Sequence, residues 1–191
     1  MALPAPSPID TPRLLLRRVE PEDLPALLEV NGDVEVTRHL PYAAWQGLAD
    51  AMAWFERISV LQATGAALQL VVVDKGLGQA IGTCLVFRHD EPSARAEIGY
   101  VLGRPHWGRG VMREALQALI ACAFDDWGLR RLEAEVNPAN TASVQLLERL
   151  GFTREGLLRQ RWTGLEGAYD VFAYGLLRGE HRAATQSPRN D

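Results

Sequence analysis

The stretch around Gly108 and Gly110 has the composition of an anion-binding turn. It follows an apolar run at 98–102 and directly precedes a helix-patterned run at 111–127. A glycine-rich turn entering a helix leaves first-turn N–H groups unpaired and aims them, with the positive end of the helix dipole, at a point where a pyrophosphate fits. The third glycine of the dinucleotide fingerprint is missing, because Arg113 stands there, and so is the Gly-Lys-Ser/Thr ending of a P-loop. An ordinary turn with a glycine N-cap is the alternative.

Composition restricts the class of protein. The chain has 191 residues, of which 47 % are hydrophobic and 23 % charged, as in an ordinary globular protein with one sizeable core. Its net charge of −4 gives no overall basic field that would attract nucleic acid or a membrane surface. Arginines gather at 13–18, 104–113 and 154–161, but local clusters of this kind usually solvate one face.

Cysteine and histidine usage indicates a reducing, cytoplasmic location and no metal site. Cys84 and Cys122 lie in apolar patterns without CxxC spacing, and the four histidines are scattered singly. No apolar run reaches the length of a membrane span, and the proline-rich start lacks the basic and apolar regions of a signal peptide. We expect residues 1–9 and 183–191 to be disordered tails.

Hydrophobic periodicity predicts the order β-α-α-β-β-β-α-β-α-β-β over a single domain at 10–178. The expected strands lie at 13–19, 67–73, 80–87, 95–102, 131–136, 152–162 and 168–177, and the expected helices at 23–30, 48–62, 111–127 and 140–150. One long crossover, at 111–127, permits one parallel strand pair. The predicted fold class is therefore α/β (α+β), with a single mixed, mostly antiparallel sheet of about seven strands and helices on both faces.

Four segments in this order resemble the GNAT superfamily of acyl-CoA-dependent N-acyltransferases. They are Ala96-Glu-Ile-Gly-Tyr-Val-Leu102, His106-Trp-Gly-Arg-Gly-Val-Met-Arg-Glu-Ala115, Asn137-Pro-Ala-Asn-Thr-Ala-Ser143 and Leu147-Glu-Arg-Leu-Gly-Phe-Thr-Arg-Glu-Gly156. Each segment is weakly specific alone, and the likeness extends over nearly all of 10–178. Within the superfamily, the chain is most similar to the branch that includes the ribosomal-protein-alanine N-acetyltransferases.

The resemblance implies a binding site for acetyl-CoA, with the pantetheine along 97–102 and the pyrophosphate on the backbone of 107–112. The implied cofactor-binding residues are Ile98, Tyr100, Val101, Leu102, Trp107, Gly108, Arg109, Gly110, Val111, Met112, Asn137 and Asn140. The chain departs from the family pattern at Pro105, where Gln or Arg is common and where proline offers no N–H. We therefore expect Arg104, Arg109 and Arg113 to supply positive charge.

Acetyl transfer from a thioester to an amine requires deprotonation of the amine and stabilisation of an oxyanion. Without a Ser-His-acid or Cys-His arrangement, direct attack in a ternary complex is more economical than a covalent intermediate. Glu97 is the candidate base, through water, and a structural carboxylate paired to an arginine is the alternative. A bulge at Gly99 is expected to turn backbone N–H groups of 98–101 toward the oxyanion.

The departing thiolate also needs a proton. In the resembling branch the serine at the position of Ser143 is placed to protonate the sulfur, and the asparagine at the position of Asn140 contacts CoA. The alternative is a helix start, with Asn140 as N-cap and Ser143 as its first-turn companion. Tyr100 and Tyr174 are further candidate acids, although aromatic residues on strands more often belong to the core.

The resemblance makes the chain an N-acetyltransferase and favours a protein or peptide N-terminal α-amine as acceptor. A small-molecule amine and a non-catalytic acyl-CoA-binding module remain as alternatives. The acceptor pocket is expected to be built from residues 37–42, 45–55 and 159–167. The final strands could pair with a second copy at a sheet edge, which gives a possible homodimer.

Overall fold

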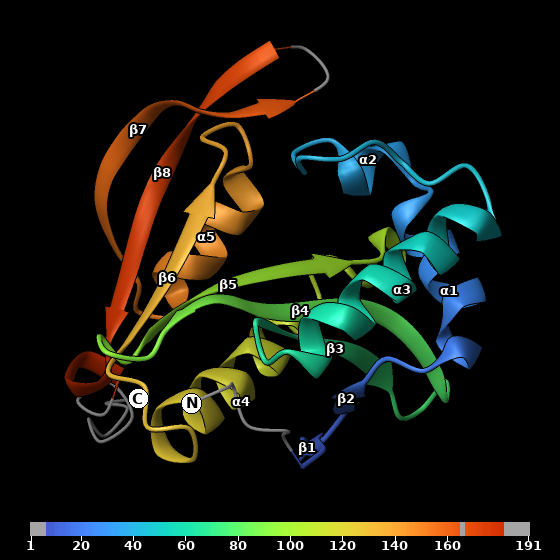
Figure 1. Ribbon diagram of the computed structural model, residues 1–191, viewed down its shortest axis with the longest axis horizontal. Helices are drawn as coiled ribbons and strands as arrows, with labels where there is room; N and C mark the ends of the chain where they lie inside the picture. Colours follow the sequence, from blue (N-terminus) through green and yellow to red (C-terminus); the bar gives the residue numbers. More distant parts are fainter. Residues whose placement is uncertain (1–6, 165–166, 182–191) are drawn as a thin grey trace.

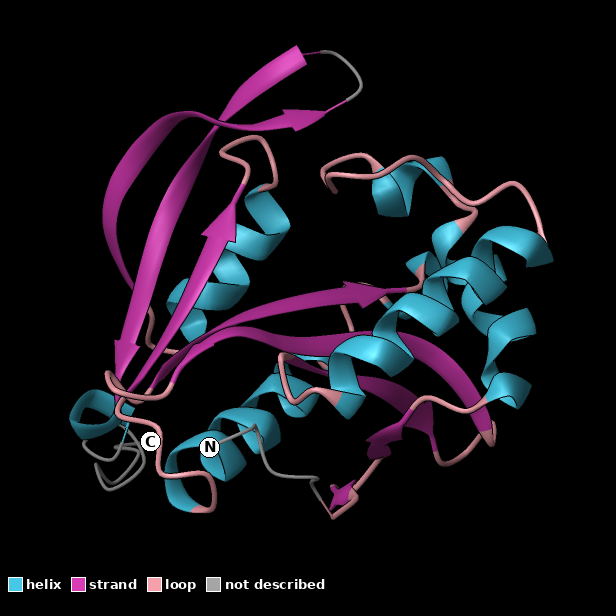
Figure 2. Ribbon diagram, viewed as in Figure 1, coloured by secondary structure: helices cyan, strands magenta, loops and turns pink. Residues whose placement is uncertain are grey.

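The computed structural model describes residues 7–164 and 167–181, and in this part the chain forms one sheet (Figures 1 and 2). The strand order is β1-β2-β3-β4-β5-β6-β8-β7. The strands are β1 (Ile9–Asp10), β2 (Leu14–Arg18), β3 (Ala67–Asp74), β4 (Gln79–Asp90), β5 (Arg95–Leu102), β6 (Arg131–Val136), β7 (Thr153–Gly164) and β8 (Gly167–Leu177). Among the described residues only the β5–β6 pair is parallel, which confirms the predicted mixed, mostly antiparallel sheet. The strand beyond the seven expected is the two-residue β1.

Helices pack on both faces of the sheet. They are α1 (Leu24–Asn31), α2 (Val34–Thr37), α3 (Leu48–Ala63), α4 (Val111–Asp125) and α5 (Thr141–Arg149), with short 3-10 turns η1 (Pro21–Asp23) and η2 (Arg104–His106). The larger core cluster joins α4 and α5 to one face, through Leu116, Leu147 and Ile98 among others. A second cluster joins α1 and α3 to the other face, through Leu27 and Ile58. No helix in 7–164 and 167–181 has the length and apolar character that a membrane crossing needs.

The sheet opens between β5 and β6, the fifth and sixth strands in its order. Residues 95–97 of β5 pair with residues 131–133 of β6, and beyond Glu97 and Glu133 the two strands diverge. Figure 1 shows β5 running toward α2 while β6, β8 and β7 rise away from it. A parallel pair needs a crossover, and α4 supplies it. The unpaired half of β5 therefore borders a cleft that crosses the sheet.

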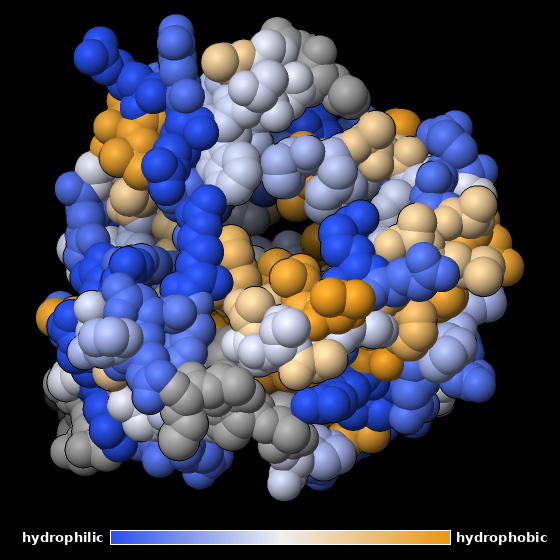
Figure 3. All heavy atoms as spheres, viewed as in Figure 1, coloured by the Kyte–Doolittle hydropathy of each residue, from blue (hydrophilic) through white to orange (hydrophobic). Residues whose placement is uncertain are grey.

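The face of β5, β6 and β7 opposite α4 carries a line of ion pairs. It runs from Arg95, which binds Asp90 and Glu133, to Arg131, which binds Glu133 and Glu155. In Figure 3 this half of the molecule is predominantly hydrophilic. Gly175 of β8 lies beneath the Arg131–Glu155 pair, and a Cβ there would meet the ends of both side chains. This face of β5, β6 and β7 is thus covered by paired charged side chains and not by a helix.

Most predicted elements are present, with differences at their ends. The missed helix is α2, which begins at the N-cap Asp33, whose carboxylate accepts a hydrogen bond from the Glu35 N–H. The prediction placed a loop at 37–42, just after α2. Ile9 and Asp10 pair with β2, while the rest of the expected tails at 1–6 and 183–191 lies outside the described residues.

We predict that substitution of Gly82 by a residue with a side chain destabilises the fold, because Gly82 lies directly opposite Leu102 of β5. An added Cβ would collide with the Val101 carbonyl oxygen and approach Leu102 Cα to 3.1 Å. We expect Gly82→Ala to lower the free energy of unfolding by about 1–3 kcal/mol, as overpacking usually does. Urea unfolding measures this loss.

Gly99→Ala on β5 is the matched control for Gly82→Ala. A Cβ at Gly99 would meet only ordinary contacts, at 3.8 Å from Phe87 Cε1 and 3.9 Å from Leu85 Cβ. Equal losses in the two variants would contradict the steric explanation.

Candidate active site

The glycine turn before α4 is shaped by backbone conformation. Gly108 and Gly110 have φ of +69° and +70°, a left-handed region that other residues rarely adopt. A Cβ at Gly108 would meet nothing within 4 Å, so conformation rather than space requires glycine there. Gly110 is the N-cap of α4 and no side chain caps the helix. The first-turn N–H groups therefore remain available to an anion.

The side chains of Arg13, Trp107 and Glu114 hold this turn. Arg13 donates from Nη1 to the Arg109 carbonyl oxygen at 3.1 Å and pairs through Nε with Glu114 of α4 at 2.6 Å. Trp107 donates its indole N–H to the Leu102 carbonyl oxygen at 2.7 Å, tying the turn to the end of β5. Arg13 lies in an arginine cluster of the sequence, but only the fold shows that it supports the turn.

A pocket of ≈ 520 Å³ lies beside the turn, within the size range of ligand sites. Its walls come from the end of β5, the glycine turn, the first turns of α4 and α5, and the segment at 35–40. The predicted site residues that line it are Tyr100, Val101, Leu102, Trp107, Gly108, Gly110, Val111, Met112, Asn140 and Ser143. Four others, Glu97, Ile98, Arg109 and Asn137, lie outside the lining. The fold thus gathers three separated motifs around one cavity.

The free edge of β5 offers backbone groups to the opening. The Gly103 N–H donates to Ile81 of β4 at 2.8 Å, and in an antiparallel pair such bonds involve alternate residues. Tyr100 and Leu102 therefore direct their N–H and C=O groups away from β4, and of these the Leu102 carbonyl already accepts the Trp107 indole N–H. The predicted bulge at Gly99 is wrong, because β5 keeps a regular register with β4 from Glu97 to Leu102. Divergence from β6, rather than a bulge in β5, frees these groups.

Two hydroxyl groups meet at the wall between β5 and α5. Burial raises the pKa of Tyr100 to about 12, and a hydrogen bond with Ser143 partly opposes that rise. Asn140 is the N-cap of α5 and accepts from the Ser143 N–H at 3.1 Å, as the helix-start interpretation expects. Tyr174 lies outside the pocket, 1 % exposed, and donates to Glu148 at 3.2 Å. Ser143 and Tyr100 are thus two neighbouring hydroxyls in the lining of the pocket.

Glu97 lies on the opposite face of β5, at its last paired position before the strands part. Its neighbours Ala96 and Ile98 face the core beneath α4. Glu97 is 6 % exposed and accepts a hydrogen bond from Arg88 Nη1 at 2.7 Å. Burial raises its pKa, and the bond and charge of Arg88 oppose that rise. Its side chain therefore borders the opening from the side opposite the pocket.

The comparisons with known proteins agree with this geometry. The acetyltransferase (GNAT) domain family matches residues 13–153 of this chain. The chain belongs to the GNAT acetyltransferase family. It is an N-acetyltransferase, and enzymes of this family use acetyl-CoA.

Relatives and neighbours differ in their acceptors. An uncharacterized N-acetyltransferase, p20 of Bacillus licheniformis, is 39 % identical over 171 residues, which cover 90 % of this chain and 96 % of that protein. A ribosomal-protein-serine acetyltransferase of Escherichia coli is 38 % identical over 92 residues, or 48 % of this chain and 51 % of that protein. The crystal structure of spermidine N-acetyltransferase from Vibrio cholerae with CoA and spermine has a TM-score of 0.78 and 21 % identity, covering 90 % of this chain and 99 % of that chain. The last likeness shows the fold alone.

Several residues of this acetyltransferase that line the pocket were not predicted as site residues. Arg113 of α4 was expected only to supply charge, and Gln145 and Arg149 of α5 lie on the pocket side of their helix, a half-turn or more after Ser143. Of the segments expected to form the acceptor pocket, 38–40 lines this cavity, whereas Trp45 and Trp54 pack on the second core cluster. Helical spacing from Thr141, which also lines the pocket, could have indicated the α5 residues, because Gln145 and Arg149 follow it at intervals of four. No such signal exists for residues 38–40, because their position depends on how α2 packs in the tertiary structure.

Gly110→Asp should weaken acetyl-CoA binding by at least about tenfold, because it places a negative charge at the helix N-terminus that faces the expected pyrophosphate. Gly110→Asn is the matched control, since Asn and Asp both tolerate the left-handed conformation and differ in charge. Isothermal titration calorimetry with acetyl-CoA measures both variants. Equal acetyl-CoA affinities in the two folded variants would contradict the assignment of the pyrophosphate to this turn.

Proposed function

We propose that this acetyltransferase transfers the acetyl group directly from acetyl-CoA to a primary amine in a ternary complex, and that the acceptor is a protein or peptide N-terminal α-amine. The observation that supports this most is the opening between β5 and β6. The pocket lies beside this opening on one face of the sheet, and Glu97 lies where the opening begins, with its carboxylate on the other face. A thioester and an amine can thus approach the same point from opposite sides.

The pocket suits the parts of acetyl-CoA, which supplies the acetyl thioester. The uncapped start of α4 and the turn at Gly108 and Gly110 would hold the pyrophosphate. The N–H and C=O of Tyr100 and the N–H of Leu102 would pair with the amides of the pantetheine, as an added strand does. The full set that we propose for cofactor binding is Ile98, Tyr100, Val101, Leu102, Trp107, Gly108, Arg109, Gly110, Val111, Met112, Asn137 and Asn140.

Two side chains would move the protons. In the transfer a C–N bond forms and a C–S bond breaks, so the amine loses a proton and the sulfur gains one. Glu97, from the acceptor side, would take the amine's proton through water. Ser143 would give its hydroxyl proton to the sulfur, with Tyr100 beside it as the alternative acid. The two groups lie on opposite sides of β5, as a base for one reactant and an acid for the other require.

The choice of an α-amine follows from its basicity. An N-terminal amine has a pKa of about 7.7–8.0, against about 10.4 for lysine, so one weak base suffices near neutral pH. The partial likeness to the ribosomal-protein-serine acetyltransferase supports a protein acceptor. A small polyamine is the second candidate, because a spermidine acetyltransferase has the same fold and the Glu97 carboxylate, which Arg88 binds at one oxygen, could also bind a cation.

A panel of acceptors tests the substrate class by thiol release from acetyl-CoA. The panel contains peptides with a free N-terminus, the same peptides with a blocked N-terminus and one lysine, and spermidine. We expect the highest kcat/KM for the free N-termini. A preference for spermidine would favour the small-molecule acceptor, and a preference for the blocked peptides would favour a side-chain amine.

Glu97→Gln should lower turnover most at neutral pH, where the acceptor amine is still largely protonated. The deficit should shrink as the pH approaches the pKa of the amine, because free amine then arrives without help. Acetyl-CoA affinity should change little, since Glu97 lies outside the pocket lining. The pH profile of kcat measures this effect, and a profile of the same shape as wild type would remove Glu97 as the base.

Ser143→Ala provides the contrast to Glu97→Gln. We expect a loss of about 10–100-fold in turnover, because water protonates a thiolate less effectively than a positioned acid does. Alkaline pH should not restore the activity, unlike the Glu97→Gln deficit. Full turnover would reduce Ser143 to a residue of the helix start.

We also propose a homodimer that forms through β7. This strand is an edge of the sheet and its side chains are exposed over nearly its whole length, including Leu157 at 48 % and Leu158 at 38 %. Exposed edges of this kind invite pairing with a second copy. Light scattering should give twice the mass of the chain, and Leu157→Asp should give a folded monomer. A monomeric wild-type protein at all concentrations would exclude the dimer.

The cysteines support a cytoplasmic location, which we propose as well. Cys84 and Cys122 are both free thiols, and Cys84 is fully buried. Burial raises the pKa of each thiol to about 12 and thereby disfavours the reactive thiolate. Such thiols are typical of a reducing compartment.

A further inference from the structure

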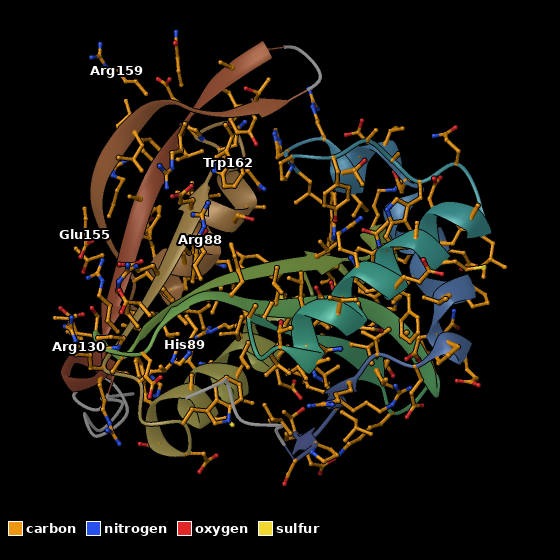
Figure 4. The ribbon with its side chains drawn as sticks, in the orientation of Figure 1. Arg88, His89, Arg130, Glu155, Arg159 and Trp162 are labelled. Atoms are coloured by element: carbon orange, nitrogen blue, oxygen red, sulfur yellow. The ribbon has the colours of Figure 1, made fainter. Side chains whose placement is uncertain are left out.

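One arginine connects both sides of the opening in the sheet. Arg88 of β4 donates from Nη1 to Glu97 of β5 at 2.7 Å and pairs with Glu135 of β6 at 3.4 Å. Its guanidinium lies over the Trp162 ring, 5.1 Å from the centroid, within the range of a cation–π contact. Figure 4 shows Arg88 and Trp162 next to each other beside β6. The side chains thus form a bridge from β4 and β5 to β6 and β7 where the strands part.

The backbone is distorted to place this arginine. Phe87 is the partner of Glu97 in the ladder, so in a regular strand the next residue would point to the other face of the sheet. Instead the register shifts after Phe87, and Arg88 has a φ of +50°. Non-glycine residues with positive φ are uncommon and often mark functional sites. The irregularity brings the guanidinium to the side of Glu97.

A second backbone irregularity, in β7, brings two more side chains to the cluster of Arg88, Glu97 and Glu135. The register between β7 and β8 shifts between Leu158 and Trp162, and Gln160 has a φ of +48°. Neighbouring residues of a strand normally face opposite sides, yet Arg161 and Trp162 both bind Glu135. Arg161 Nη2 lies 3.0 Å from Glu135 Oε1, and the Trp162 indole N–H donates to Oε2 at 2.5 Å.

The two carboxylates in the cluster are not equivalent. Glu135 receives hydrogen bonds at both oxygens, from Arg88 and Arg161 at Oε1 and from Trp162 at Oε2. Glu97 accepts from Arg88 at Oε2, and no other donor in the described part of the chain bonds its carboxylate. Both carboxylate oxygens of Glu135 thus accept hydrogen bonds from the protein. Glu97 instead has one oxygen that could accept a hydrogen bond from a water or an amine.

We infer that Arg88 is a positioning residue for Glu97, held across the opening by Glu135 and Trp162 so that Glu97 turns its second oxygen toward the acceptor amine. The inference rests on the proposed role of Glu97 as base. It adds Arg88 and Glu135 to the residues on which the reaction depends, although neither lines the pocket. Arg88 would fix the direction of the carboxylate and keep it charged.

The charges around Glu97 predict the direction in which its pKa changes when Arg88 is replaced. The charged groups that act on it are Arg88 from β4, Glu133 and Glu135 from β6, and Arg161 from β7. Burial and the two glutamates raise the pKa of Glu97, and Arg88 lowers it. Without Arg88 the carboxylate should hold its proton to a higher pH, because its nearest opposing charge is gone.

The test follows kcat against pH in Arg88→Gln and Arg88→Lys, with Arg95→Gln as the matched control. Arg95 binds Glu133 at 2.8 Å on the same face of the sheet, but its ion pairs are with Glu133 and Asp90 and not with Glu97. We expect Arg88→Gln to move the acidic limb of the kcat–pH profile to higher pH and to lower kcat roughly tenfold at pH 6.5. This loss is smaller than the full contribution of a positioned base. Arg88→Lys should restore the limb partly, and Arg95→Gln should leave it in place.

A titration of Glu97 separates this inference from the proposed base. In protein labelled with ¹³C at glutamate carboxyls, the Glu97 signal is identified by its loss in Glu97→Gln. We expect its midpoint to rise in Arg88→Gln, with the acidic limb of kcat rising in parallel. An unchanged midpoint would overturn the role of Arg88 alone. A raised midpoint with an unchanged limb would instead show that Glu97 is not the base, and both proposals would fall.

Discussion

The parallel pairing of β5 with β6 stops after Glu97 and Glu133, and the arrangement of this acetyltransferase depends on that stop. A parallel ladder leaves no backbone group free, so a continued pairing would close the sheet. Because the strands diverge, the edge of β5 keeps unpaired N–H and C=O groups beside a pocket on one face and a buried carboxylate on the other. Figure 3 shows a hollow at the centre of the molecule, at the place where the two halves of the sheet separate.

The two faces of the sheet are covered by different means. Apolar side chains of α4 and α5 seal one face around Leu116 and Leu147. Over β5, β6 and β7 the other face carries ion pairs in place of a helix, with Arg131 between two glutamates. Exposed ion pairs of this kind contribute little to stability. Their main consequence is that this face is polar and is not covered by a helix.

The family motifs were predictable because their chemistry is local. A glycine with positive φ, an uncapped helix start and an asparagine N-cap each depend on a few consecutive residues, and the structure has them at Gly108, Gly110 and Asn140. Strand and helix positions followed from hydrophobic period for the same reason. The prediction failed at Gly99, where an isolated glycine in a strand suggested a bulge that a regular register excludes.

The sequence by itself determined the family, the order of the longer helices and strands and the glycine turn before α4, since these follow from residue type and spacing along the chain. Only the tertiary structure decided which side of β5 each candidate occupies, with Tyr100 and Ser143 in the pocket and Glu97 outside it. It also decided the partners of Glu97. A strand's period of two predicts that Arg88 points away from Glu97, and the irregular backbone after Phe87 reverses this. Such a reversal depends on contacts between β4, β6 and β7, which lie far apart in the sequence.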